Sequence, residues 1–135
     1  MCEFKYADIF CFDYIKDNDE HISSEMLYRK IKDNEVIIAK IDNRIIGWLR
    51  YGYFWDSIPF MNMLMIDKRY RRKGIGKSMV EFWEKEMKVK GYKTLMTSSL
   101  SKELAQHFYR KLGYKDAGSL ILQNDALEII FTKEI

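Results

Sequence analysis

The sequence contains little cysteine, proline and histidine, and these shortages exclude several classes of protein. Its 135 residues include two cysteines, one proline and two histidines. Cys2 and Cys11 are too few and too close together for a disulfide framework, and no spacing of cysteine and histidine suits a metal site. We therefore expect two free thiols and no bound metal.

Long apolar runs are absent as well. No run approaches the ~20 residues of a membrane-spanning helix, and the first residues, MCEFKYADIF, lack the charged-then-apolar order of a signal peptide. The sequence thus predicts a cytoplasmic protein with no membrane partner. Because 47% of the residues are apolar and no low-complexity tract occurs, we expect a single domain over residues 1–135.

Residues 61–91 combine an apolar strand, a basic turn with two glycines and a long amphipathic helix. The turn has the order Arg71-x-x-Gly74-x-Gly76 and comes directly after the strand. The helix is indicated by apolar residues at helical spacing, namely Ile75, Met79, Phe82, Trp83 and Met87. Gly91 is expected to end it.

This turn has the properties of a phosphate-binding site. The first turn of a helix carries N–H groups without partners inside the helix and partial positive charge from the aligned peptide dipoles. Gly74 and Gly76 let a ligand come close to the backbone, because they have no Cβ. The spacing matches neither the glycine-rich turn of dinucleotide folds nor the P-loop. The turn therefore predicts a phosphate site of another kind.

Five basic residues lie within positions 68–73, and a nucleic-acid surface would also explain them. No basic stripe continues elsewhere in the chain, however, and the cluster coincides with the glycine turn. A compact polyanion accounts for both features, so we expect no nucleic-acid partner.

The remaining elements predict helices interspersed with a sheet. We expect strands at 4–12, 36–41, 45–53, 60–66, 93–98, 120–122 and 127–131, and helices after Ser23 and at 102–112. Asp42-Asn43 and residues 123–126 should form hairpin turns, Gly113 should follow a helix end, and Pro59 should lie in a connection. This order predicts an α/β or α+β fold with a mixed central sheet flanked by helices.

Aromatic residues crowd the segment 51–60, around Asp56. Tyr51, Tyr53, Phe54, Trp55 and Phe60 either line a pocket or fill a core, and the sequence leaves both interpretations open. In the first case, Tyr51, Tyr53, Trp55 and Asp56 are candidates for binding an acceptor substrate.

Two motifs resemble those of one family. The turn is similar to the acetyl-CoA loop of the GNAT superfamily of N-acetyltransferases, Arg/Gln-x-x-Gly-x-Gly/Ala. Ala105-x-x-Phe108-Tyr109-x-x-Leu112-Gly113-Tyr114 resembles the family's second signature and follows at the usual distance. The resemblance covers about residues 20–135, and segments 64–77 and 105–114 carry nearly all of its specificity.

The resemblance implies how acetyl-CoA would be bound. The family's mostly antiparallel sheet splays between two strands, and pantetheine lies in the gap. Backbone groups of Leu64, Met65 and Ile66 would pair with the pantetheine amides, and Arg71 would orient the turn. The pyrophosphate would be cradled by Arg72, Lys73, Gly74, Ile75, Gly76 and Lys77.

The resemblance also implies a mechanism. Tyr109 would protonate the departing CoA thiolate, although an aromatic on an amphipathic helix also suits a core, and the Ile66 N–H would stabilise the oxyanion. Where many members have a glutamate base, this chain has Thr97, which leaves a water chain, Asp56 or Glu25 as candidates. Lys102 replaces an asparagine, so that Ser99 or Ser101 would have to supply its pantetheine contact.

We expect an acyltransferase that moves acetyl from acetyl-CoA to an amine of a small molecule or peptide by direct transfer. The alternative is a non-catalytic acyl-CoA-binding domain that acts as a sensor or subunit. With one helix expected between the first two strands, the acceptor site would be open, or a second subunit of a homodimer would complete it.

Overall fold

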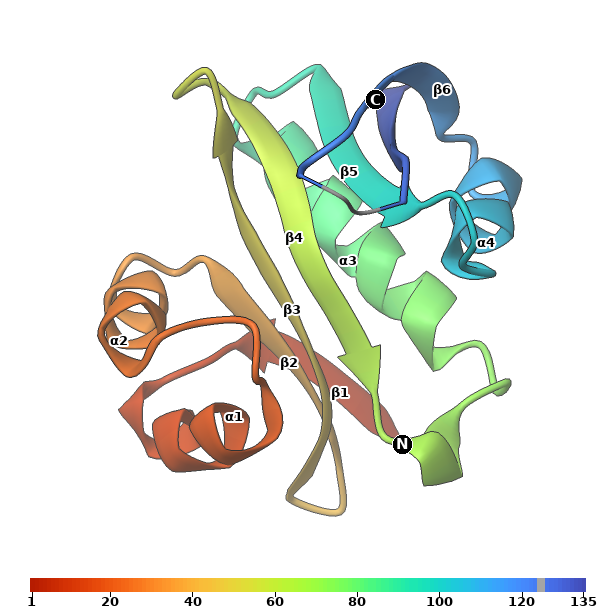
Figure 1. Cartoon of the computed structure of the whole chain (residues 1–135). Coiled ribbons are helices and arrows are strands. Elements are labelled where there is room, and N and C mark those ends of the chain that lie inside the picture. Colours follow the sequence, from red (N-terminus) through yellow and green to blue (C-terminus); the bar gives the residue numbers. More distant parts are fainter. Residues whose placement is uncertain (124–125) are drawn as a thin grey trace. The chain divides into compact units, whose positions relative to one another are not determined.

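The computed structural model describes residues 1–123 and 126–135 (Figure 1). Its elements in chain order are β1 Cys2–Tyr6, η1 Ile9–Cys11, α1 Phe12–Asn18, α2 Ser24–Lys32, β2 Val36–Ile41, β3 Arg44–Phe54, β4 Ile58–Ile66, η2 Lys68–Tyr70, α3 Ile75–Val89, β5 Thr94–Leu100, α4 Ala105–Lys111, β6 Lys115–Leu120 and β7 Glu128–Glu134. The strands form one seven-stranded sheet in the order β1-β2-β3-β4-β5-β7-β6. Strands β4 and β5 pair in parallel, at Phe60↔Met96 and Met61↔Thr97, whereas the neighbouring pairs β1–β2, β2–β3, β5–β7 and β6–β7 are antiparallel. The predicted mixed, mostly antiparallel sheet flanked by helices is confirmed.

The chain divides into two compact units. The first comprises Met1–Tyr51 and Met63–Trp83, and the second comprises Gly52–Asn62 and Glu84–Ile135. The expectation of one domain over residues 1–135 stays a prediction. No helix among the described residues is long and apolar enough to cross a membrane.

In the first unit, helices α1 and α2 lie side by side and pack on alternate residues of β2 and β3 (Figure 1). This core includes Ile15, Leu27, Val36, Ile38 and Trp48. Because strand side chains alternate between faces, Ile37 and Leu49 point the other way. Helix α3 contributes Phe82, 5.9 Å from the Phe4 ring, and Trp83, 5.8 Å from the Tyr51 ring. The buried stripe predicted for this helix is confirmed at Met79, Trp83 and Met87.

A buried ion pair fastens the connection between α1 and α2 to β3. The Nε atom of Arg50 donates to Oδ2 of Asp19 at 2.7 Å, and the two side chains are 6% and 0% exposed. The Trp48 indole N–H donates to the same carboxylate at 3.0 Å, and the His21 backbone N–H donates to its other oxygen. These three hydrogen-bond partners of Asp19 all lie in the first unit.

In the second unit, β7 pairs with β5 on one side and with β6 on the other. Glu84 of α3 accepts hydrogen bonds from the Tyr114 hydroxyl at 2.8 Å and from Nζ of Lys133 at 3.0 Å. These contacts join α3, the end of α4 and β7, and Tyr114 is buried.

Several local predictions are confirmed by the backbone. The Ser23 hydroxyl accepts from the Met26 N–H, so Ser23 is the N-cap of α2. Asp42 and Asn43 have φ values of 49° and 65°, which suits a tight hairpin turn. Gly91 has φ 95°, and the helix end is closed by bonds from Tyr92 N to Met87 O and from Gly91 N to Lys88 O.

Other local predictions are wrong. Two helices lie between the first strands, because residues 12–18 form α1, where no helix was expected, and the strand expected at 4–12 spans only Cys2–Tyr6. Pro59 lies inside β4 and is buried. The partner of the last strand is 115–120, not 120–122, and β5 runs on to Leu100, so α4 begins only at Ala105. The turn expected at 123–126 includes residues 124 and 125, which lie outside the described residues.

Candidate active site

The glycine turn lies between β4 and α3 in the first unit. Nε of Arg71 donates to the carbonyl oxygen of Ile66 at 2.7 Å, and its Nη2 lies 3.3 Å from the sulfur of Met65. The first residue of the motif thus holds the turn against the last residues of the strand. Arg72 and Gly74 adopt positive φ values of 62° and 81°. A left-handed arginine is strained, and such strain is common where backbone N–H groups are aimed at a ligand.

Helix α3 starts with the charge pattern expected of an anion site. The Ser78 N–H donates to the Gly74 carbonyl at 3.0 Å, which begins the helical hydrogen bonds. The preceding N–H groups of Ile75, Gly76 and Lys77 therefore have no intrahelical acceptor. The first turn contains no acidic residue, and four exposed basic residues surround it, namely Arg71, Arg72, Lys73 and Lys77. A diphosphate would find both donors and positive charge here.

Gly47 of β3 allows the backbone of β4 to approach closely, and the sequence analysis missed it. A Cβ at position 47 would lie 2.7 Å from the carbonyl oxygen of Met65 and 2.7 Å from Cδ1 of Ile66. Leu64 and Met65 are half-buried and Ile66 is 9% exposed. A glycine inside a β-branched strand pattern is the sequence signal that could have found this contact.

Tyr109 of α4 lies in the second unit, as does Thr97 of β5. Tyr109 is 7% exposed, and its ring centroid lies 6.0 Å from those of Tyr114 and Phe131. Burial raises the pKa of Tyr109 to about 12, against an opposing hydrogen bond with Thr97, while the charge of Glu103 raises it further. The hydroxyl therefore keeps its proton at neutral pH.

Thr97 occupies the position where a glutamate base was considered. Its hydroxyl donates to the Met61 carbonyl at 3.0 Å, and its side chain is buried. Thr97 thereby joins β5 to β4 at the pair Met61↔Thr97 and also contacts Tyr109. Ser99 and Ser101 are the candidates for the pantetheine contact that the missing asparagine would make. Of these two, Ser99 is buried and directs its hydroxyl to the Leu100 carbonyl.

The aromatic candidates for acceptor binding separate into different environments. Tyr51 is fully buried in the first unit, and its hydroxyl donates to the Asn34 carbonyl at 3.1 Å. In the second unit, Tyr53 packs against Tyr92, with ring centroids 5.8 Å apart. Trp55 is 78% exposed in the turn between β3 and β4, next to exposed Asp56. The burial of Tyr51 favours a core role over direct substrate contact.

The two acidic candidates for a general base lie at the surface, as do the two histidines of the chain. Asp56 and Glu25 are exposed, and so are both histidines, His21 and His107. The structure brings none of these four side chains into a hydrogen bond with another side chain among the residues that it describes. The contacts of these side chains therefore single out none of them as a general base.

Comparison with known proteins agrees with this geometry. Residues 32–116 match the model of the family described as acetyltransferase (GNAT) domain. The match spans more than half of the chain, and the chain belongs to this family.

One curated relative shows a low sequence identity to the chain. The chain is 29% identical over 96 residues to the probable N-acetyltransferase 14 of Danio rerio, a match that covers 70% of this chain and 34% of the relative. The chain thus spans about a third of that relative's length.

Two solved structures show the shared fold. The fold is similar to Ard1 from Thermoplasma volcanium, with a TM-score of 0.85, 10% identity and coverage of 99% and 97% of the two chains. It is also similar to a GNAT family acetyltransferase from Elizabethkingia anophelis with acetyl-CoA bound, with a TM-score of 0.79, 20% identity and coverage of 99% and 98%.

Proposed function

We propose that the protein is an N-acetyltransferase that moves an acetyl group from acetyl-CoA to a primary amine by direct transfer in a ternary complex. The observation that carries this proposal is the glycine turn at the start of α3. It offers unpaired N–H groups and four basic side chains, without an acidic residue in the first turn of the helix.

These residues suit the phosphates of acetyl-CoA, which supplies the acetyl group as an activated thioester. In the proposal, Arg72 to Lys77 bind the pyrophosphate, and Arg71 positions the turn through its bond to the Ile66 carbonyl. Backbone groups of Leu64, Met65 and Ile66 pair with the pantetheine amides. The close approach at Gly47 supports the position of this strand segment.

The chemical step needs an acid and a stabilised oxyanion. The amine nitrogen attacks the thioester carbon, the C–S bond breaks, and we assign the proton taken up by the sulfur to the Tyr109 hydroxyl. The raised pKa of about 12, caused mainly by burial, supports Tyr109 as a proton donor because the hydroxyl is protonated before the step. We assign oxyanion stabilisation to the Ile66 N–H.

The proton lost by the amine has no assigned protein acceptor. Thr97 cannot serve, because a hydroxyl has no basicity near neutral pH and this one donates to the Met61 carbonyl. A water chain, Asp56 or Glu25 would take the proton in this proposal. The presence of Thr97 in place of a glutamate also favours the alternative function, a domain that binds acyl-CoA without turning it over.

The acceptor in this proposal is a small-molecule or peptide amine, and the protein acts in the cytoplasm. Tyr53, Trp55 and Asp56 remain proposed acceptor contacts, whereas the buried Tyr51 is withdrawn from them as a core residue of the first unit. The presence of both α1 and α2 weakens the reason to expect an incomplete acceptor site. A homodimer is therefore a separate proposal, which light scattering at micromolar concentration tests directly.

The proposed activity is tested by incubating the protein with acetyl-CoA and a panel of small amines and peptides. An enzyme should release CoA thiol only when a suitable amine is present, and mass spectrometry should find one acetyl group added to that amine. Tight binding of acetyl-CoA with no amine-dependent release across the panel would favour the non-catalytic alternative.

A further inference from the structure

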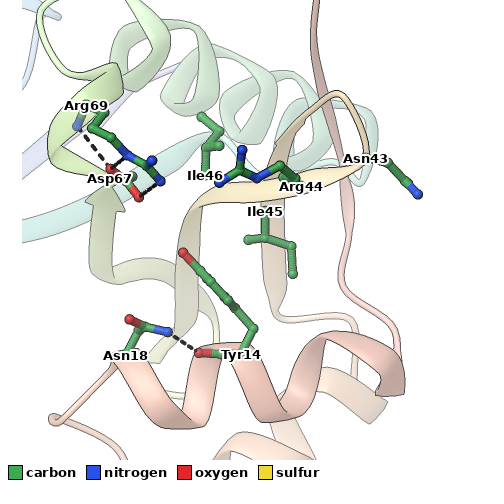
Figure 2. A pocket seen from close by; sticks show the side chains of 8 residues that line it. All are labelled: Tyr14, Asn18, Asn43, Arg44, Ile45, Ile46, Asp67 and Arg69. Carbon is green, nitrogen blue, oxygen red and sulfur yellow. Dashed lines mark hydrogen bonds and ion pairs between the residues drawn. The ribbon is translucent and has the colours of Figure 1, made fainter.

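The first unit contains a hollow of about 500 Å³ (Figure 2). None of the residues Arg71 to Lys77 of the glycine turn lines it. Its walls come from α1, the start of β3 and the segment after β4, and include Tyr14, Asn18, Arg44, Ile45, Asp67 and Arg69. The volume lies within the range of sites for small ligands, roughly 300–1,000 Å³.

Arg44 offers this hollow an uncommitted guanidinium. It is exposed at the first position of β3, and its side chain has no hydrogen bond or ion pair with any residue that the structure describes. The Arg69 guanidinium, in contrast, is paired with Asp67, whose oxygens accept from its Nε and Nη2 at 3.4 Å. Two cations and one anion therefore line the hollow, and the excess positive charge belongs to Arg44.

Tyr14 supplies a second donor. Its ring is fixed edge-on to Trp48, with centroids 6.1 Å apart and an angle of 86°. The side chain extends from α1 across the hollow, and its hydroxyl has no hydrogen-bond partner among the described residues (Figure 2). Burial raises the pKa of Tyr14, the nearby charge of Asp67 raises it further, and the charges of Arg69 and Arg44 act in the opposite direction, so the hydroxyl lies within reach of all three charged groups.

We propose that this hollow binds a small organic anion through a carboxylate or phosphate group. The anionic group pairs with the Arg44 guanidinium, whose planar fork suits two-oxygen recognition, and accepts a hydrogen bond from the Tyr14 hydroxyl. The apolar part of the ligand lies on the half-buried Ile45 and the face of Tyr14. The proposal concerns a ligand site in addition to the acetyl-CoA site.

The test uses two probes with the same ring and different anionic groups, phenyl phosphate and benzoate. Each is titrated calorimetrically into the protein with CoA present at saturation, so that anions do not bind at the glycine turn. We expect one binding event with at least one probe, and the stronger probe identifies the preferred group. Arg44→Ala should weaken binding at least about tenfold, because a charged hydrogen-bonded pair is lost.

Two further variants make the result specific. Tyr14→Phe keeps the ring and should weaken binding by roughly two- to tenfold through loss of one hydrogen bond. Arg29→Ala removes the same charge from the exposed surface of α2, outside the hollow, and should leave probe affinity unchanged. Binding that is equal in wild type and Arg44→Ala, binding that Arg29→Ala weakens equally, or no binding of either probe by the folded protein would overturn the proposal.

Discussion

Arg71 and Ile66 are joined by a hydrogen bond of 2.7 Å from the arginine Nε to the strand carbonyl. The bond ties the first residue of the glycine motif to the last residue of β4, five positions earlier. It therefore fixes where the glycine turn leaves the sheet. Arg71 is a positioning residue as well as a source of charge.

Arg71→Ala should lower both the stability and the acetyl-CoA affinity of the protein. Loss of the bond to Ile66 should reduce the free energy of unfolding by about 1 kcal/mol. Lys73→Ala is the matched control, because it removes a neighbouring positive charge that has no bond to the strand. It should weaken acetyl-CoA binding without the loss of stability. Equal unfolding midpoints in urea for Arg71→Ala and wild type would contradict this role.

Tyr109→Phe should reduce turnover and leave acetyl-CoA affinity within about twofold of wild type. The variant keeps the buried ring and removes the proposed acid, a contribution of typically 10²- to 10⁴-fold in rate. Because the pKa of Tyr109 is raised to about 12, mainly by burial, its ionisation should not limit activity below about pH 11. Tyr28→Phe, on the exposed surface of α2, is the control. Full turnover by Tyr109→Phe would remove this residue from the mechanism.

Gly47→Ala should destabilise the protein by about 1–3 kcal/mol, as expected for an overpacked site. The added methyl would meet the Met65 carbonyl at 2.7 Å, and a backbone atom cannot move aside cheaply. Because β4 would shift where pantetheine is proposed to pair, acetyl-CoA affinity should fall as well. Urea unfolding and calorimetry measure the two effects, and a variant as stable as wild type would show that the strands adjust freely.

Acid should weaken the first unit through Asp19. Burial would raise the pKa of this carboxyl, but hydrogen bonds from Arg50, the His21 N–H and Trp48 together lower it below its ordinary value. A carboxyl with a lowered folded-state pKa stabilises the protein above its unfolded pKa of about 3.9, and this stability is lost as pH falls through the folded value.

Asp19→Ala should therefore cost about 3–5 kcal/mol near neutral pH, since Arg50 is left buried and unpaired. It should also flatten the dependence of unfolding free energy on pH below about 4. Asp17→Ala, an exposed change on α1, is the control and should do neither. An unfolding curve for Asp19→Ala that falls with acid as steeply as that of wild type would count against the ion pair.

The sequence predicted what depends on local signals. The stripe through Met79 and Trp83 and the closing Gly91 were found because helix periodicity and helix ends are written in neighbouring residues. The hairpin at Asp42-Asn43 was found for the same reason. Helix α1 was missed because the aromatic and apolar residues before Asn18 suit either a strand or a short helix.

Contacts between distant residues could not be predicted in this way. The pairing of Asp19 with Arg50 and of Glu84 with Tyr114 joins positions about thirty residues apart, and no local pattern marks them. Tyr51 illustrates the same limit, since an aromatic strand residue can face a pocket or a core until its neighbours are known. Pro59 was placed outside β4 because proline lacks the N–H that a central strand uses.

The central claim, that the glycine turn binds acetyl-CoA, is tested most directly by calorimetric titration of acetyl-CoA into wild type and Gly76→Glu. The new carboxylate would occupy the proposed phosphate position at the first turn of α3 and would repel the phosphate groups of acetyl-CoA. Val89→Glu adds the same charge at a residue 86% exposed near the other end of the helix and serves as the control. The account predicts micromolar binding by wild type and Val89→Glu, and its loss in a folded Gly76→Glu. Undiminished binding by Gly76→Glu, or no binding by folded wild type, would contradict it.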